Sequence, residues 1–107
     1  MRSSKEDVES ILEDMRVAIC DGKYQPFDRK KNLDTLAKLG WMWDDAIDEM
    51  LMLTYSDYVC GPEKDREFPL DDDWWIFHRN INGLCIYIKF KILYLRDRSV
   101  MIMSFHD

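Results

Sequence analysis

The side chains best suited to acid–base chemistry in this chain gather in its last third. His78 and His106 are the only two histidines, and Tyr87 lies between them in the sequence. An imidazole generally titrates near neutral pH, so it can give and take protons under physiological conditions. Lys89 and Lys91 follow Tyr87 at alternate positions, and lysines can hold phosphate oxygens. These residues point to chemistry on a phosphate, provided that the fold brings them together.

The elements that must position them are β-strands. Three segments have strand composition: WWIFHRNI from residue 74, LCIYIKFKILYL from residue 84 and VMIMSF from residue 100. The first two are separated by Asn82-Gly83, which is the strongest short-range signal for a hairpin turn. We expect a second turn centred on Arg96-Asp97. The three segments then form one antiparallel meander.

If both turns are symmetric, they fix the register of the meander. The predicted cross-strand pairs are Ile81 with Leu84, Phe77 with Ile88, Trp75 with Phe90, His78 with Tyr87, Leu95 with Arg98, Lys91 with Ile102, and Tyr87 with His106. Opposed residues share a face, and faces alternate along each strand. A slip of one residue in either hairpin would break this arrangement.

The predicted register separates the side chains into two faces. The first is a core face for helices to cover, and it carries Trp75, Phe77, Ile81, Leu84, Ile86, Ile88, Phe90, Ile92, Met101, Met103 and Phe105. The second carries Trp74, Ile76, His78, Tyr87, Lys89, Lys91, Ser104 and His106. Tyr87 thus has one histidine opposite it on each side.

Two acid–base groups flanking a phosphate suit RNA cleavage, in which a 2′-hydroxyl attacks its own phosphodiester. The candidate catalytic residues are His106, Tyr87 and His78, and the candidate substrate-binding residues are Lys89, Lys91 and Arg79. This chemistry needs no metal or other cofactor. The plainer interpretation is that polar residues on the open face of a sheet are simply solvated.

Helical periodicity marks the first half of the chain. We expect helices over residues 5–20, about 28–39 and from about 44 to 53, with Ser4 capping the first and Gly22 and Gly40 ending the first two. Their expected buried positions are Val8, Ile11, Leu12, Met15, Ile19, Leu33, Leu36, Leu39, Ala46, Ile47, Met50 and Leu51. Trp41, Met42 and Trp43 can serve the core or form a partner patch.

The remaining segments read as connections. The sequence GKYQPFD contains Pro26 and predicts a turn, and YSDYVCGPEKDREFPLDDD predicts a long loop before the sheet. That loop is either functional, as long loops in compact domains often are, or a solvated linker. Three helices followed by a meander predict an α+β fold, with the helices packed on one face of a three-stranded sheet.

Length and composition limit the class of protein. A chain of 107 residues with 47% hydrophobic and 34% charged residues predicts one globular domain, 1–107, with a helical half (1–59), a loop (60–73) and a sheet (74–107). No apolar run suggests a secretory signal or a membrane span, so we expect a cytoplasmic protein. Cys20, Cys60 and Cys85 are too few and too scattered for a disulfide framework or a zinc site.

The net charge of −6 hides an uneven distribution. Residues 74–107 carry five basic and two acidic side chains, a net charge of +3, whereas residues 1–73 carry ten and nineteen, a net charge of −9. A mildly basic sheet is compatible with RNA. The acidic half supports an alternative function, a non-catalytic binding or inhibitor protein that acts on a nucleic-acid-binding partner. Its charges can equally be solvated helix faces.

Three stretches carry a resemblance to a known family. YSDYVCGPEKD, WWIFHRNINGLCIYIKFKI and the terminal VMIMSFH resemble the motility quorum-sensing regulator (MqsR) toxins of bacterial type II toxin–antitoxin systems. The resemblance covers about the C-terminal half of the chain. Those toxins are small mRNA endoribonucleases with a RelE-like α/β fold. The resemblance therefore implies cleavage of single-stranded mRNA without a metal, and inhibition by a cognate antitoxin protein.

Carried over by position, the family's functional residues match this chain in part. Tyr87 stands at the family's tyrosine, and His106 replaces the basic residue that closes the terminal strand. Cys60 stands where the family has a lysine, and Trp74 approximately where it has a glutamine. At these last two positions the chain departs from the family pattern, and His78 and Lys89 are candidates to compensate.

Overall fold

The computed structural model describes residues 2–107 and contains three α-helices in the first half of the chain. They are α1 (Lys5–Cys20), α2 (Lys30–Leu39) and α3 (Trp43–Met50), followed by a short 3-10 helix, η1 (Tyr55–Asp57). All three predicted helices are confirmed. The Ser4 hydroxyl caps α1 by accepting a hydrogen bond from the Asp7 backbone N–H at 3.2 Å. None of the helices within residues 2–107 is long and apolar enough to cross a membrane.

The sheet is larger than the sequence predicts, with five strands in place of three. They are β1 (Tyr24–Pro26), β2 (Tyr58–Glu63), β3 (Trp74–Ile81), β4 (Leu84–Ile92) and β5 (Val100–His106), in the order β1-β5-β4-β3-β2. β1 pairs parallel with β5, and the other pairs are antiparallel. β1 lies in the predicted turn and β2 in the predicted loop. Both carry proline and are edge strands, where a missing N–H costs little, and this weakened their strand signal.

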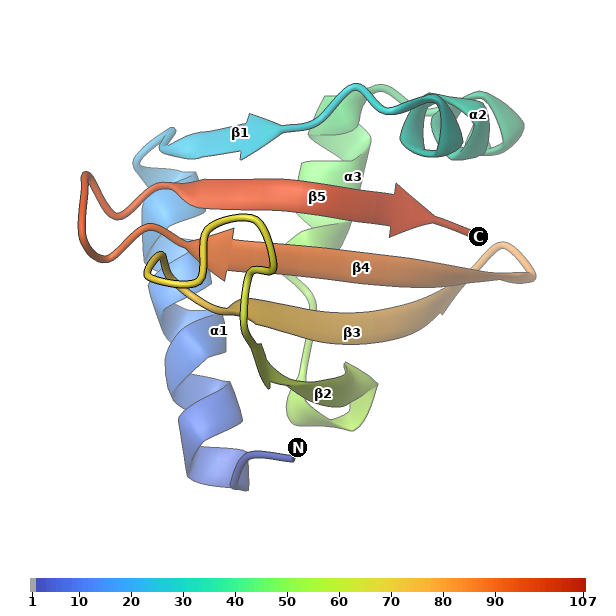
Figure 1. The fold of residues 1–107 in the computed structure, drawn as a ribbon. Helices are drawn as coiled ribbons and strands as arrows, with labels where there is room; N and C mark the ends of the chain where they lie inside the picture. The colour runs from blue at the N-terminus through green and yellow to red at the C-terminus, as the bar shows by residue number, and fades with distance from the viewer. Residues whose placement is uncertain (1) are drawn as a thin grey trace.

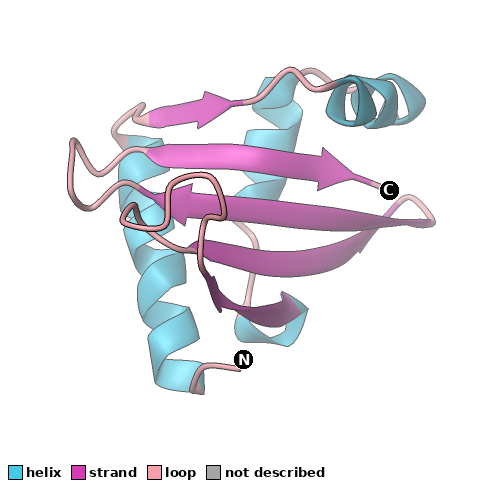
Figure 2. Cartoon of the chain, in the orientation of Figure 1, coloured by secondary structure: helices cyan, strands magenta, loops and turns pink. Residues whose placement is uncertain are grey.

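Two layers give the α+β fold its core. α1 and α3 cover one side of the sheet, and α2 lies beyond β5 at the end of the sheet that holds the C-terminus (Figure 1). The buried side chains of α1 and α3 meet the inward residues of β3, β4 and β5 in a single cluster. On the opposite side a loop between β2 and β3 crosses the sheet (Figure 2), and it is the only segment among residues 2–107 to do so. We call it the 64–73 loop after its residues. We call this second side the open face.

The predicted register of the first hairpin is confirmed. His78 pairs with Tyr87, Phe77 with Ile88, and the pairing continues to the Asn82-Gly83 turn. Asn82 and Gly83 have φ angles of 50° and 83°, as a two-residue hairpin of the primed type requires. The turn alone therefore sets the alternation of the two strands.

The predicted register of the second hairpin is right at one end and wrong at the other. Tyr87 pairs with His106 as predicted, but Lys91 pairs with Met101 and not with Ile102. The register shifts between Lys89 and Phe90, which leaves Met103 as the extra residue of a β-bulge. Met101 and Met103 consequently lie on the open face and not on the predicted core face, whereas Ile102 is fully buried in the core.

α2 is attached to β5 by a buried amide. The Asn32 Nδ2 group donates hydrogen bonds to the backbone oxygens of Phe27 at 2.9 Å and Met103 at 3.0 Å, and its Oδ1 accepts from the Phe105 N–H at 3.0 Å. The predicted buried line of α2 is wrong in one position, since Leu33 is 44% exposed while Asn32 is fully buried. The helix is held by hydrogen bonds to the β5 backbone, which an apolar periodicity cannot reveal.

We expect Asn32→Ala to lower the free energy of unfolding by about 2–3 kcal/mol, because it removes the partners of buried backbone groups. Urea denaturation followed by circular dichroism measures this change. Asn80→Ala, the same substitution at an exposed strand position, should change it by less than about 0.5 kcal/mol. Equal effects of the two substitutions would show that the Asn32 amide does not anchor α2.

The aromatic segment at the start of α3, residues 41–43, belongs mainly to the core. The rings of Trp41 and Trp43 each lie 6.4 Å from the ring of Phe105, and both tryptophans are partly buried. Met42 between them is 74% exposed. Two of the three residues therefore pack on the end of β5.

Candidate functional site

The side chains of the open face lie in three successive rows across the sheet, and each row contains polar groups. One row consists of His78, Tyr87 and His106, which we call the histidine row. The second contains Cys60, Ile76, Lys89 and Ser104, and the third contains Glu63, Trp74, Lys91 and Met101. The 64–73 loop crosses the third row and leaves the histidine row uncovered (Figure 1).

The histidine row brings together the three candidate catalytic residues. Tyr87 is 38% exposed, and its ring lies 5.5 Å from the ring of His106. His78 is exposed on the other side of Tyr87, opposite it in the β3–β4 ladder. Three adjacent strands thus present imidazole, phenol and imidazole in one line. The two hairpins position all three, so no loop needs to move to assemble them.

The Nδ1 atoms of the two histidines contact different groups. His106 Nδ1 lies 3.1 Å from the backbone oxygen of Asp107. A carbonyl oxygen only accepts, so Nδ1 carries the proton when this hydrogen bond forms, and Nε2 is then free to take up a proton. His78 Nδ1 lies 3.9 Å from Cys85 Sγ, a weaker contact that fixes no tautomer.

The Tyr87 hydroxyl stays neutral at physiological pH. Partial burial, followed by the charge of Glu63, raises its pKa above the ordinary value of 10.0. A neutral phenol donates a hydrogen bond and accepts one. Tyr87 is therefore suited to hold a phosphate oxygen between the two histidines.

The two lysines predicted to bind phosphate have different environments. Lys89 is partly exposed, with its Nζ 5.5 Å from the centroid of the Trp74 ring. Lys91 is 1% exposed, and its Nζ lies 2.8 Å from Asp65 and 3.2 Å from Asp71. Lys89 thus lies one row from the histidine row and has no ion-pair partner among residues 2–107, while Lys91 holds the 64–73 loop on the sheet.

The anchor of this loop is electrostatic. The hydrogen bond from Lys91 lowers the pKa of Asp65 to about 2, assisted by the backbone N–H groups of Glu67 and Phe68 at 2.9 and 3.0 Å. Asp71 accepts from Lys91 and also from Arg96 at 3.1 Å. Two of the acidic residues that precede β3 in the sequence, Asp65 and Asp71, thus neutralise the buried Lys91.

Arg79 does not join the open face. Its guanidinium lies on the helix side, where Nε donates to Glu49 at 2.5 Å and Nη1 to Asp57 at 3.1 Å. These contacts, first of all the hydrogen bond with Glu49, raise its pKa. The structure gives Arg79 the role of joining β3 to α3 and η1, away from the histidine row.

The two positions at which the chain departs from the MqsR pattern both lie on the open face. Cys60 pairs with Ile76 in the row next to the histidines, and burial raises the pKa of its thiol. Trp74 is 4% exposed beneath the 64–73 loop, with Lys91 Nζ 4.5 Å from its ring centroid. A neutral thiol and a buried indole thus stand at these positions.

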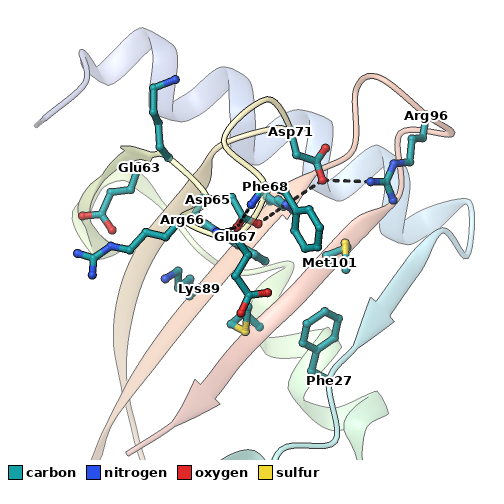
Figure 3. Close-up of a pocket in the computed structure, with 14 residues that line it drawn as sticks. Phe27, Glu63, Asp65, Arg66, Glu67, Phe68, Asp71, Lys89, Arg96 and Met101 are labelled. Carbon is teal, nitrogen blue, oxygen red and sulfur yellow. Dashed lines mark hydrogen bonds and ion pairs between the residues drawn. The ribbon is translucent and has the colours of Figure 1, made fainter.

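A cleft of about 840 Å³ adjoins the histidine row on its Lys89 side. It lies between the 64–73 loop, β5 and the link after β1, and its lining includes Phe27, Glu67, Phe68 and Met103 (Figure 3). The sequence patterns do not single out these residues, because Phe27 follows a short edge strand and the place of Met103 depends on the bulge. The segment EKDREF, residues 63–68, is dense in charged and aromatic residues, and this composition was the sequence signal that could have indicated a binding site here.

Known protein families and curated protein sequences offer no counterpart for this site. Comparison of the chain with models of known protein families finds no match, and comparison with curated protein sequences finds none either. Within residues 2–107, no group of three or more His, Cys, Asp and Glu side chains is placed to hold a metal ion. The site must be interpreted from its own geometry.

Proposed function

We propose that this protein is an endoribonuclease that cleaves single-stranded RNA by attack of a 2′-hydroxyl on the adjacent phosphodiester, without a metal. The observation that carries the proposal is the pairing of Tyr87 with His78 on one side and with His106 on the other. Two imidazoles and a phenol in one exposed row supply a base, an acid and a hydrogen-bond donor.

The contacts of each histidine suggest its role. His106 Nε2 takes the proton of the 2′-hydroxyl, since Nδ1 is engaged with the Asp107 carbonyl. The 2′-oxygen then attacks phosphorus, and the bond from phosphorus to the 5′-oxygen breaks. His78 gives a proton to that leaving oxygen. The products are a 2′,3′-cyclic phosphate and a 5′-hydroxyl, while Tyr87 and Lys89 hold the charged phosphate oxygens.

The spacing of the row suits this reaction. His78 and His106 lie on strands that flank β4, so their backbones are separated by two strand spacings, about 9.6 Å. An in-line displacement places acid and base on opposite sides of phosphorus, each at a hydrogen-bond distance of about 2.7 Å from its oxygen. Side chains from next-nearest strands can reach both ends, whereas those of adjacent strands would lie too close together.

The biological setting that we propose follows from the resemblance to the MqsR toxins. In that setting the protein is a RelE-like mRNA interferase of a type II toxin–antitoxin system, and a cognate antitoxin protein inhibits it. The α+β order of helices and meander and the placement of Tyr87 and His106 on one face support this proposal. A gene for a small DNA-binding protein next to that of this chain would support it further.

The test is cleavage of a short single-stranded RNA by the purified protein in the presence of a metal chelator. We expect products with 2′,3′-cyclic phosphate ends, identified by mass spectrometry, and no cleavage of the 2′-deoxy or 2′-O-methyl analogue. Cleavage of the deoxy analogue would contradict attack by the 2′-hydroxyl. Intact RNA after prolonged incubation would reject the proposed activity.

The alternative, an acidic inhibitor of a nucleic-acid-binding protein, is favoured by the charge on the helical side. Among the exposed acidic residues of α1 and α3 are Glu6, Glu9, Asp44 and Asp48. Some of this charge is already paired, as in Lys5–Glu9 with the two charged atoms 3.9 Å apart. Affinity purification separates the two functions, because a small DNA-binding protein as partner supports the toxin and a nuclease or polymerase supports the inhibitor.

A further inference from the structure

The cleft beside the histidine row has aromatic walls from two separate segments. Phe27 and Phe68 face the cleft from opposite sides, with Met101 between them on the sheet (Figure 3). Phe68 is 61% exposed, so its ring is accessible to a ligand in the cleft. Two opposed rings above a thioether floor can enclose a flat aromatic ligand, as proteins that bind single-stranded RNA enclose a base.

The charged side chains that line the cleft are Glu63, Lys64, Asp65, Arg66, Glu67, Asp71, Lys89, Lys91 and Arg96. Lys91, Asp65, Asp71 and Arg96 neutralise one another in ion pairs. The Glu67 carboxylate points into the cleft beside Phe68 (Figure 3), and within the described part of the chain it has no hydrogen-bond or ion-pair partner. It is therefore an acceptor available to a ligand.

The cleft and the histidine row are connected through Lys89. This residue lines the cleft and lies two positions from Tyr87 on β4, which is about 6.8 Å along the strand. That separation is comparable with the step from one nucleotide to the next in an extended single strand. A phosphate held at the histidine row thus places a neighbouring base at the mouth of the cleft.

We propose that the cleft binds one base of the RNA next to the cleaved phosphate and selects a base with an exocyclic amino group. This inference rests on the proposed function. Phe27 and Phe68 stack on the two faces of the base, and Glu67 accepts a hydrogen bond from its amino group. Adenine and cytosine carry an amino group at the position where uracil has its O4 carbonyl oxygen, which a carboxylate repels, and guanine carries an amino group at C2. Uracil has no amino group and only its ring N3–H as a donor on this edge.

The test measures binding with oligonucleotides that cannot be cleaved. Short oligomers of 2′-O-methyluridine, unchanged or with one cytosine or adenine, are titrated into the full chain and followed by ¹H–¹⁵N NMR. We expect the oligomers with an amino base to bind about tenfold more tightly than the uridine oligomer, with shifts at Phe68 and Met103. Glu67→Gln should abolish this difference, because an amide can also donate to a carbonyl oxygen.

Two further variants complete the design. Phe68→Leu should weaken binding of all oligomers by about tenfold while preserving their order, because stacking does not distinguish bases. Leu70→Ala, at a 94% exposed position of the same loop, should leave binding unchanged. Equal affinity of the wild-type protein for all oligomers, or base preference retained in Glu67→Gln, would overturn the inference.

The result of this binding test can be distinguished from the result of the RNA-cleavage test of the proposed function. RNA cleavage with no base preference rejects the role of the cleft and leaves the ribonuclease intact. Selective binding of amino bases without any cleavage retains the cleft and rejects the catalytic role of the histidine row. Absence of both rejects both.

Discussion

Replacing His106 by alanine is expected to lower the rate of RNA cleavage by about 100- to 10,000-fold, the range typical for loss of a general acid or base. His106 is half-buried at the end of β5, and its side chain contacts Tyr87 and the Asp107 backbone. The substitution should therefore leave the fold intact. Single-turnover cleavage of a defined RNA measures the rate, and circular dichroism checks the fold. Expression of His106→Ala should likewise relieve any growth inhibition caused by the wild-type protein.

The assignment of base and acid can be tested separately. His78→Ala should cause a loss of similar size, and the double variant should lose little more, because the two residues act as a unit. A substrate with an aryl leaving group needs no protonation of that group, so it should restore activity to His78→Ala and not to His106→Ala. The reverse result would exchange the roles.

A control variant shows whether a substitution away from the histidine row also lowers the rate of RNA cleavage. Met52→Ala removes a 58% exposed side chain between α3 and η1, away from the open face, and should cleave RNA at the wild-type rate. If His106→Ala and His78→Ala also cleave at that rate, the histidine row is a solvated surface and the catalytic proposal fails.

The hairpins show why part of the site is predictable from the sequence. Asn82-Gly83 is a local signal, and the alternation of a strand carries its register from the turn to His78 and Tyr87. The placement of His106 opposite Tyr87 was also right, although the second turn is not symmetric. Near the turn the pairing is one residue away from the predicted register, as in Ile92 with Val100, and the extra residue Met103 restores the predicted register from Ser104 to His106. The two offsets cancel at His106, which no local sequence signal predicts.

The sequence-based predictions that were wrong concern features that depend on contacts between distant segments of the chain. β1 is a strand because β5 pairs with it, and three residues containing a proline carry too little intrinsic signal. Lys91 has the pattern of an exposed lysine on an open strand face, and only the 64–73 loop buries it. The sequence shows the acidic residues Asp65 and Asp71, but it does not show that both pair with Lys91. Sequence alone therefore located the histidine row and missed the cleft beside it.

The largest expected effect on stability is that of Lys91→Met, which should lower the free energy of unfolding by about 3–5 kcal/mol at neutral pH. The substitution keeps the length of the side chain but leaves the carboxylates of Asp65 and Asp71 without their buried cation. Changing both aspartates to asparagine in the Lys91→Met protein should restore part of the loss. Lys89→Met, the neighbouring lysine of the same strand face without an ion pair in the described chain, should cost less than about 1 kcal/mol.

The same ion pair predicts how stability depends on pH. The pKa of Asp65 is about 2 in the folded protein, against an ordinary value of 3.8, so the folded state binds this proton more weakly than the unfolded state. The contribution of Asp65 is therefore fully present above its ordinary pKa and is lost as the pH falls from 3.8 towards 2. Urea denaturation at a series of pH values should show this decline in the wild-type protein and a shallower one in Lys91→Met, in which the hydrogen bond from Lys91 is lost and the backbone N–H groups of Glu67 and Phe68 still lower the pKa of Asp65. Hydrogen exchange should show the 64–73 loop opening before β4, because Lys91 joins the loop to the strand and the strand keeps its own ladder. Parallel pH profiles of the two proteins would mean that Lys91 does not anchor the loop.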